Sequence, residues 1–153
     1  MKTLIVYCST YKGNTEKIAK VFAEKIDADL INLKNSKDIN IDGYDLIGFG
    51  SGVYRESMSP QLFKCIEKLK LEGKNVFAFS TSGVGLTFYN NKLIKLLKSK
   101  GAVCRGSFAC KGSFVSKEFS DNKIFDFMSK FAEGHPNDKD LSKARKFITK
   151  TAL

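Results

Sequence analysis

The chain has 153 residues, of which 42% are hydrophobic, and it carries a net charge of +10 at pH 7. A chain of this length buries one core, so we expect a single domain over residues 1–153. Its apolar runs are only a few residues long, whereas a bilayer span needs roughly 20, and the first residues lack the cleavage site of a signal peptide. The composition therefore argues against a membrane span, and we expect a soluble protein of the cytoplasm.

The four cysteines give no sign of a metal centre. Zinc ligands recur at CxxC spacing or beside paired histidines, and neither pattern is present here. Reduced thiols in a cytoplasm are the simplest interpretation, so we expect no structural metal. The four cysteines are Cys8, Cys65, Cys104 and Cys110.

Apolar stretches typical of strands alternate along the chain with amphipathic stretches typical of helices. Strands are predicted at Thr3–Tyr7, Asp29–Leu33, Tyr44–Phe49, Asn75–Phe79 and Ala102–Cys110. Helices are predicted after Asn14, from Pro60, and over Tyr89–Lys100, Lys123–Phe131 and Lys139–Thr151.

Individual residues mark where several of these helices begin and end. Pro60 suits the first position of a helix, and Gly101 suits the residue after one. Asn137 can cap the last helix, while Asp138 and Asp140 suit its positive start.

Five short apolar strands separated by helices predict a doubly wound α/β domain, with a parallel sheet covered by helices on both faces. In such a sheet a ligand binds beyond the carboxyl ends of the strands, where the strand order reverses. Functional residues are therefore expected in the loops that follow the strands.

The loop after the first strand contains short hydroxyls, an amide and successive backbone N–H groups at the start of a helix. Such groups are the donors that a phosphate needs, although an ordinary capped turn would have the same residues. The loop lacks both the GKS or GKT ending of a nucleoside-triphosphate loop and the GxGxxG of a dinucleotide loop, so phosphoryl transfer is not supported. The loops after the third and fourth strands are rich in glycine and serine, and their glycines could serve tight turns or let the backbone approach a flat ligand.

Taken together, the segments STYKGNT, YDLIGFGSGVY, FSTSGVG, GSFACKG and GHPNDKDLSKARKF resemble the flavodoxin-like family of FMN proteins. The resemblance covers essentially the whole chain. It implies a five-stranded parallel sheet of order 2-1-3-4-5 with FMN at its carboxyl edge, and a short-chain type without a long insertion in the fifth strand.

The resemblance also implies which residues hold FMN. Its phosphate is expected at Ser9, Thr10, Tyr11, Lys12, Gly13, Asn14 and Thr15, a loop one residue longer than the commonest flavodoxin pattern. Its ring is expected between Ser51, Gly52, Val53 and Tyr54 on one side and Thr81, Ser82, Gly83, Val84 and Gly85 on the other. The chain has no tryptophan to stack on the ring, which leaves Tyr54 together with Phe88 or Tyr89.

Charge is concentrated in one part of the chain, because residues 73–117 contain eight lysines and arginines and no acid. Such a segment can be a solvated face, or it can attract an acidic protein, an anionic substrate or nucleic acid. With a flavodoxin-like site, the excess predicts redox partners with an acidic docking face.

The sequence favours an electron carrier that moves one or two electrons between redox proteins and has no catalytic residue of its own. The single histidine, His135, suits a capping or surface role, and Ser9 lacks a His and Asp relay. The alternative is an FMN-dependent oxidoreductase acting on a quinone, porphyrin or similar planar substrate, with Arg55 meeting an acidic group. A cofactor-free nucleic-acid module is disfavoured because the loops keep their small polar residues.

Overall fold

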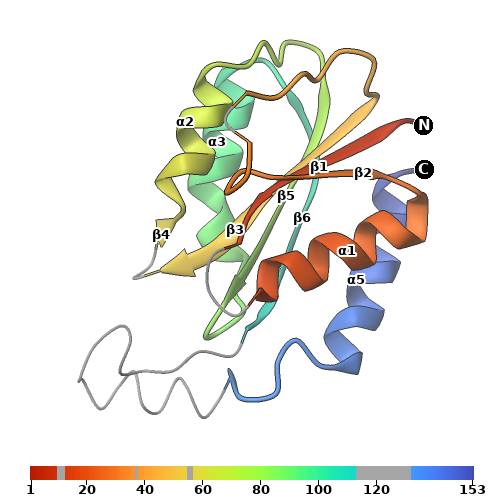
Figure 1. Ribbon diagram of the computed structural model, residues 1–153, viewed down its shortest axis with the longest axis vertical. Helices are drawn as coiled ribbons and strands as arrows, with labels where there is room; N and C mark the ends of the chain where they lie inside the picture. Colours follow the sequence, from red (N-terminus) through yellow and green to blue (C-terminus); the bar gives the residue numbers. More distant parts are fainter. Residues whose placement is uncertain (10–12, 37, 55–56, 113–131) are drawn as a thin grey trace.

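The structure is a computed structural model that describes residues 1–9, 13–36, 38–54, 57–112 and 132–153, with the backbone alone at Tyr54 (Figure 1). Its strands are β1 (Thr3–Cys8), β2 (Asp29–Asn32), β3 (Leu46–Tyr54), β4 (Ser57–Met58), β5 (Asn75–Ser82) and β6 (Val103–Lys111). Its helices are α1 (Asn14–Ile26), α2 (Pro60–Glu67), the 3-10 helix η1 (Thr87–Asn90), α3 (Asn91–Ser99) and α5 (Asp138–Thr151). The helix predicted over Lys123–Phe131 lies outside the described residues.

The sheet has the strand order β2-β1-β3-β5-β6, and these five strands are parallel. β5 and β6 are the fourth and fifth predicted strands, so the expected order 2-1-3-4-5 and the doubly wound α/β fold are confirmed. Helices α2 and α3 cover one face, and α1 and α5 cover the other (Figure 1). The strand order reverses between β1 and β3, which places the expected ligand position at the carboxyl ends of these two strands.

Two strands are longer at their carboxyl ends than their sequence predicts. β3 starts at Leu46 rather than Tyr44 and continues through the polar residues to Tyr54, and β5 continues to Ser82. Glycine and serine disfavour strands, but here both neighbours of each strand supply pairing partners, as in the register Ser51 to Ser80. The short antiparallel strand β4, which pairs with the end of β3, was not predicted at all.

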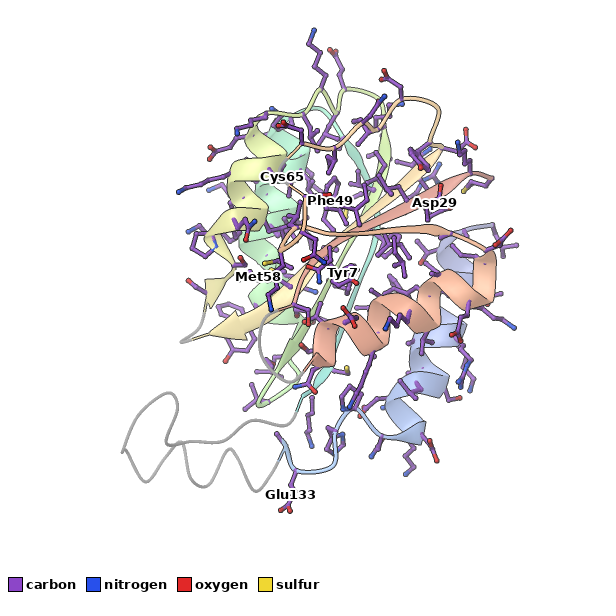
Figure 2. All side chains as sticks on the ribbon, in the orientation of Figure 1. Tyr7, Asp29, Phe49, Met58, Cys65 and Glu133 are labelled. Carbon is purple, nitrogen blue, oxygen red and sulfur yellow. The ribbon has the colours of Figure 1, made fainter. Side chains whose placement is uncertain are left out.

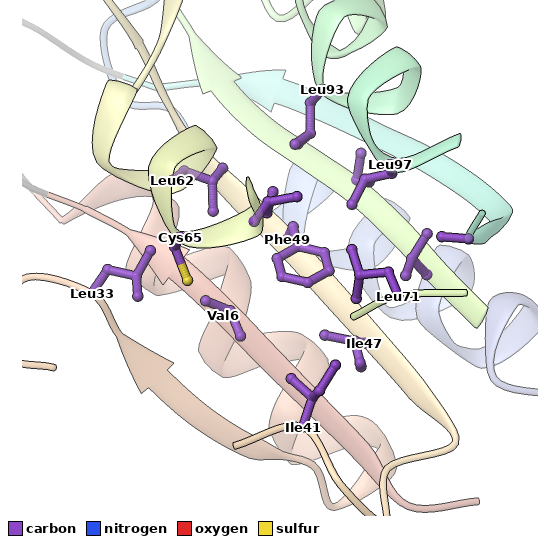
Figure 3. Packing of buried hydrophobic residues seen from close by; sticks show 14 of the residues in the cluster. Val6, Leu33, Ile41, Ile47, Phe49, Leu62, Cys65, Leu71, Leu93 and Leu97 are labelled. Carbon is purple, nitrogen blue, oxygen red and sulfur yellow. The ribbon is translucent and has the colours of Figure 1, made fainter. Parts of the chain in front are cut away.

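One core lies between the sheet and helices α2 and α3, the side on which Met58 and Cys65 also lie (Figures 2 and 3). Val6, Ile47 and Phe49 from the sheet pack with Leu62 of α2 and Leu97 of α3, and none of these five side chains has exposed surface. Burying each such side chain stabilises the fold by about 1.5–3 kcal/mol. The regularly spaced apolar side chains of α2 and α3 therefore pack against a continuous apolar face of the sheet.

The opposite core is aromatic. The ring of Phe22 on α1 meets the ring of Phe79 edge to face, with centroids 5.2 Å apart. Further ring contacts join them to residues of β5, β6 and α5, namely Phe77, Phe108 and Phe147. Edge-to-face pairs add about 0.5–1.5 kcal/mol beyond the area that they bury.

Glycines of β3 make room for these rings. A methyl group added at Gly50 would lie 2.5 Å from three ring atoms of Phe79, and one added at Gly48 would overlap the ring of Phe77. The close approach of β3 to the aromatic core thus requires glycine at both positions. Gly50, in the segment YDLIGFGSGVY, is therefore a packing residue.

Helix α5 begins as its sequence predicts. The side chain of Asn137 accepts from the Asp140 backbone N–H at 3.0 Å, while the carboxylate of Asp140 accepts from the Asn137 N–H at 2.8 Å. This reciprocal capping box confirms the predicted cap. None of the described helices is long and apolar enough to cross a membrane.

Candidate functional site

The start of α1 lies at the carboxyl edge of the sheet, next to the reversal of strand order. Gly13 immediately precedes the helix in the left-handed conformation, with φ of 66°, and the space around it is open. The hydroxyl of Ser9 accepts from the backbone N–H of Glu16 at 3.3 Å. First-turn N–H groups have no acceptor within their helix, so this end attracts anions. Thr10, Tyr11 and Lys12 lie outside the described residues.

A pair of threonines joins this helix start to β5. The hydroxyls of Thr15 and Thr81 lie 2.8 Å apart, and either can be the donor. The two side chains are only 2% and 4% exposed. Two of the expected site residues, 66 positions apart in sequence, are thus in direct contact at this edge.

The loop after β5 is held against the end of β6. The hydroxyl of Ser82 accepts from the Gly85 N–H at 2.7 Å, and the Ser82 carbonyl accepts from the Gly112 N–H at 2.9 Å. Gly85 has φ of 69°, and a methyl group there would lie 2.9 Å from the backbone nitrogen of Lys111. The predicted residues Gly83 and Val84 lie in this turn, half-buried. Glycine at position 85 lets the loop approach β6 closely.

Gly112 in turn lies against α1. A methyl group added at Gly112 would come within 2.7 Å of the Asn14 side chain. The end of β6, the turn after β5 and the start of α1 therefore form one contiguous rim. The sequence pattern did not single out this contact, although GSFACKG contains the glycine.

Ser51 differs from the other expected site residues because its side chain points into the fold. It has no exposed surface, accepts from the Ser59 N–H at 3.0 Å, and donates to the Gly52 carbonyl at 2.8 Å. Gly52, Val53 and the backbone of Tyr54 belong to the end of β3, not to a loop. Only backbone groups of Ser51 could reach a ligand, and the ring of Tyr54 is outside the described part of the chain.

An acidic residue sits in the first turn of α1, yet its charge is compensated. The Tyr7 hydroxyl donates to one oxygen of Glu16 at 3.1 Å, and Lys20 lies 3.1 Å from the other (Figure 2 labels Tyr7). Burial, together with the bond to Glu16, raises the pKa of Tyr7 to about 12, while Lys20 and Tyr7 hold the pKa of Glu16 below its usual value. The Glu16 carboxylate is thereby held by Tyr7 and Lys20, and the Lys20 ammonium offsets its repulsion of an anion at the same helix end.

The start of α5 contributes a second polar cluster. His135 Nδ1 lies 2.5 Å from the carboxylate of Asp140, the same carboxylate that completes the capping box. Burial raises the pKa of the Cys110 thiol to about 12, with Asp140 adding to the shift. The single histidine therefore serves the helix cap, as expected, and Cys110 is a protonated thiol rather than a nucleophile.

Neither a metal site nor a disulfide is found at this edge. All four cysteines are free, and the described residues contain no group of three or more metal-ligating side chains. The arrangement offers hydroxyls, backbone N–H groups and a positive helix end, which can hold an anion.

Comparison with known proteins shows the family of the chain. The Flavodoxin domain family matches residues 4–137. An uncharacterised protein of Methanocaldococcus jannaschii is 42% identical over 150 residues, covering 96% of this chain and 95% of that protein. Two solved structures share the fold. Oxidised flavodoxin 2 of Bacillus cereus has a TM-score of 0.69 and is 20% identical, with 99% of this chain and 98% of that chain covered. Oxidised flavodoxin 1 of the same organism has a TM-score of 0.67 and is 19% identical, with 99% of this chain and 97% of that chain covered. The resemblance found in the sequence is confirmed, and the chain belongs to the flavodoxin family.

Proposed function

We propose that this protein binds FMN and carries one or two electrons between redox proteins. The observation that supports this most directly is the buried Thr15–Thr81 contact, which lies beside the start of α1 where flavodoxin-like sheets receive their ligand. Residues 1–153 act in this proposal as one domain in the cytoplasm. The four free thiols are compatible with that compartment.

The protons of the threonine pair suit a phosphate group. Each hydroxyl has one proton, and the 2.8 Å contact uses only one of the two. A phosphate oxygen is a strong charged acceptor, and the positive end of α1 favours it further. The donor set at this edge therefore fits FMN.

The remaining site residues would hold the flavin ring mainly through their backbone. The hydroxyls of Ser51 and Ser82 are already engaged within the protein, so N–H and carbonyl groups at the ends of β3 and β5 are the groups left to meet the ring. Tyr54 supplies an aromatic side chain for stacking. When bound, FMN supplies redox chemistry in one- or two-electron steps, and the chain holds and orients it.

The residues near the rim favour a carrier over an enzyme. The Cys110 thiol is buried and stays protonated, so it is not placed as a nucleophile or general base. An electron carrier needs no such group. With a net charge of +10, the proposed partners are redox proteins with an acidic docking face.

The experiment is an FMN titration of the purified chain, followed by a turnover assay. We expect quenching of FMN fluorescence and flavin absorption bands at about 370 and 450 nm that stay with the protein on gel filtration. Failure to retain FMN would contradict the proposal. Rapid multiple turnover with NAD(P)H and a quinone, without a second protein, would instead support the oxidoreductase alternative.

A further inference from the structure

Two large apolar side chains are exposed directly beside the candidate site. Leu86 is 53% exposed and Phe88 is 70% exposed, and they follow the turn that packs on β6. The other large exposed apolar residues among those described are terminal or lie at the opposite edge of the sheet, where Val103 begins β6. Among the described residues, exposed large apolar side chains next to the site therefore come from this segment.

The same segment leads into a lysine face. Helix α3 follows η1, which contains Phe88, without a break, and Lys92 and Lys95 lie three residues apart on one face of α3. All three are exposed, whereas Leu93 and Leu97 on the other side of α3 are fully buried. We call Leu86, Phe88, Lys92 and Lys95 the η1–α3 face.

Within the described parts of the chain, no acid forms an ion pair with the lysines of this face. The two ion pairs among the described residues, Glu16 with Lys20 and His135 with Asp140, lie elsewhere. The Lys92 ammonium lies 5.4 Å from the ring centre of Phe63, a contact that orients it but leaves its charge. The sequence places no acid anywhere in residues 73–117.

We propose that the η1–α3 face is where an acidic redox protein docks. An apolar centre beside charged side chains is the usual composition of a protein interface, and lysines steer an acidic partner toward it. Because the face adjoins the rim, docking there brings the partner's redox centre toward the flavin. Flavin held at the rim would there accept one electron from the partner, whose own centre would be oxidised by one electron. This inference rests on the proposed function.

A competing basic surface exists on the other side of the molecule. Lys25 and the second half of α5 line a shallow hollow whose cations are Lys25, Arg145, Lys146 and Lys150. Lys25 is near the carboxyl end of α1, and Lys150 is near the carboxyl end of α5, so this hollow is remote from the rim. It lacks the exposed aromatic ring that the η1–α3 face presents, and it serves as the control surface.

The test uses an acidic [4Fe–4S] ferredoxin, reduced beforehand, as the probe. Stopped-flow mixing with the FMN-loaded protein gives the second-order rate constant, and calorimetry of the oxidised pair gives the affinity. Lys92→Glu/Lys95→Glu is compared with Lys146→Glu/Lys150→Glu, which makes the same charge change about one helical turn apart on two exposed cations of the control surface. We expect the first pair to lower the rate constant by at least about fivefold more than the second, with the difference shrinking at high salt.

The apolar part is tested separately with Leu86→Gln against Val103→Gln, since the wild-type side chains have similar exposures of 53% and 49%. Only the first should weaken ferredoxin binding. FMN affinity is measured for every variant, so that loss of cofactor is not mistaken for loss of docking. If the wild type does not bind FMN, the proposed function fails, and calorimetry on the cofactor-free chain still tests the face. Equal effects of the two lysine pairs, a larger effect on α5, or displacement of ferredoxin by duplex DNA at stoichiometric amounts would overturn the docking proposal.

Discussion

Replacing the two buried threonines by valine separates their role in the fold from their role in binding FMN. Thr15 and Thr81 lie 2.8 Å apart and are almost fully buried, and valine has nearly the same shape. A single Thr15→Val or Thr81→Val leaves the other hydroxyl without its partner, so we expect the free energy of unfolding to fall by about 1–3 kcal/mol. The double variant removes both polar groups together and should be closer to the wild type, because paired replacement by apolar groups is nearly neutral.

FMN affinity should respond differently. A hydrogen bond to a charged phosphate is worth about 1.5–3 kcal/mol, so the double variant should bind FMN about 10- to 150-fold more weakly even where its stability recovers. Urea denaturation of the cofactor-free chain gives the stability, and FMN fluorescence gives the affinity. If the double variant bound FMN as tightly as the wild type, the threonine pair would be a packing feature only and the assignment of the phosphate position would be wrong.

Three further predictions test the core, the thiol and the phosphate loop. Gly50→Ala brings a methyl group 2.5 Å from the Phe79 ring, so urea denaturation should show a loss of at least about 1–3 kcal/mol, partly recovered in Gly50→Ala/Phe79→Leu; full stability of Gly50→Ala would contradict this packing. The pKa of Cys110 is raised from 9.0 to about 12, so its contribution to stability is complete below pH 9 and is lost as the pH rises toward 12. Between pH 9 and pH 12, the free energy of unfolding should decline less for Cys110→Ala than for the wild type. Equal declines of the two proteins would count against a buried neutral thiol. From the sequence alone, Lys12→Glu should weaken FMN binding by repelling the phosphate, and unchanged affinity in fluorescence titration would show that Lys12 takes no part.

Strand order and helix starts could be predicted because each depends on a local signal. Apolar runs of strand length, Pro60 at the beginning of α2 and Asn137 before α5 are readable without knowing the neighbours. Alternating helices then fix a parallel sheet, since each crossover must return the chain in the same direction. Within the described residues, the five strands of the parallel sheet and helices α1, α2, α3 and α5 all lie where these inferences expect them, whereas β4 and η1 were not predicted.

The ends of β3 and β5 could not be predicted in the same way. Residues Ser51 and Ser82 have weak strand preference, and they extend their strands only because neighbouring strands pair with them. Pairing of this kind depends on residues far away in sequence. The close contact of Gly112 with Asn14 could not be predicted for the same reason, because the two residues are far apart in sequence.

The glycines show most clearly why a motif must be tested against packing. Gly48 and Gly50 occur in the segment that resembles a flavin loop, yet their missing side chains are needed by the rings of Phe77 and Phe79. Gly13, by contrast, faces open space in a left-handed turn, where no core contact requires it. Gly13 is instead explained by its left-handed backbone, which shapes the turn that leads into α1. The glycines of the family segments thus divide into residues that build the sheet and a residue that shapes its ligand edge.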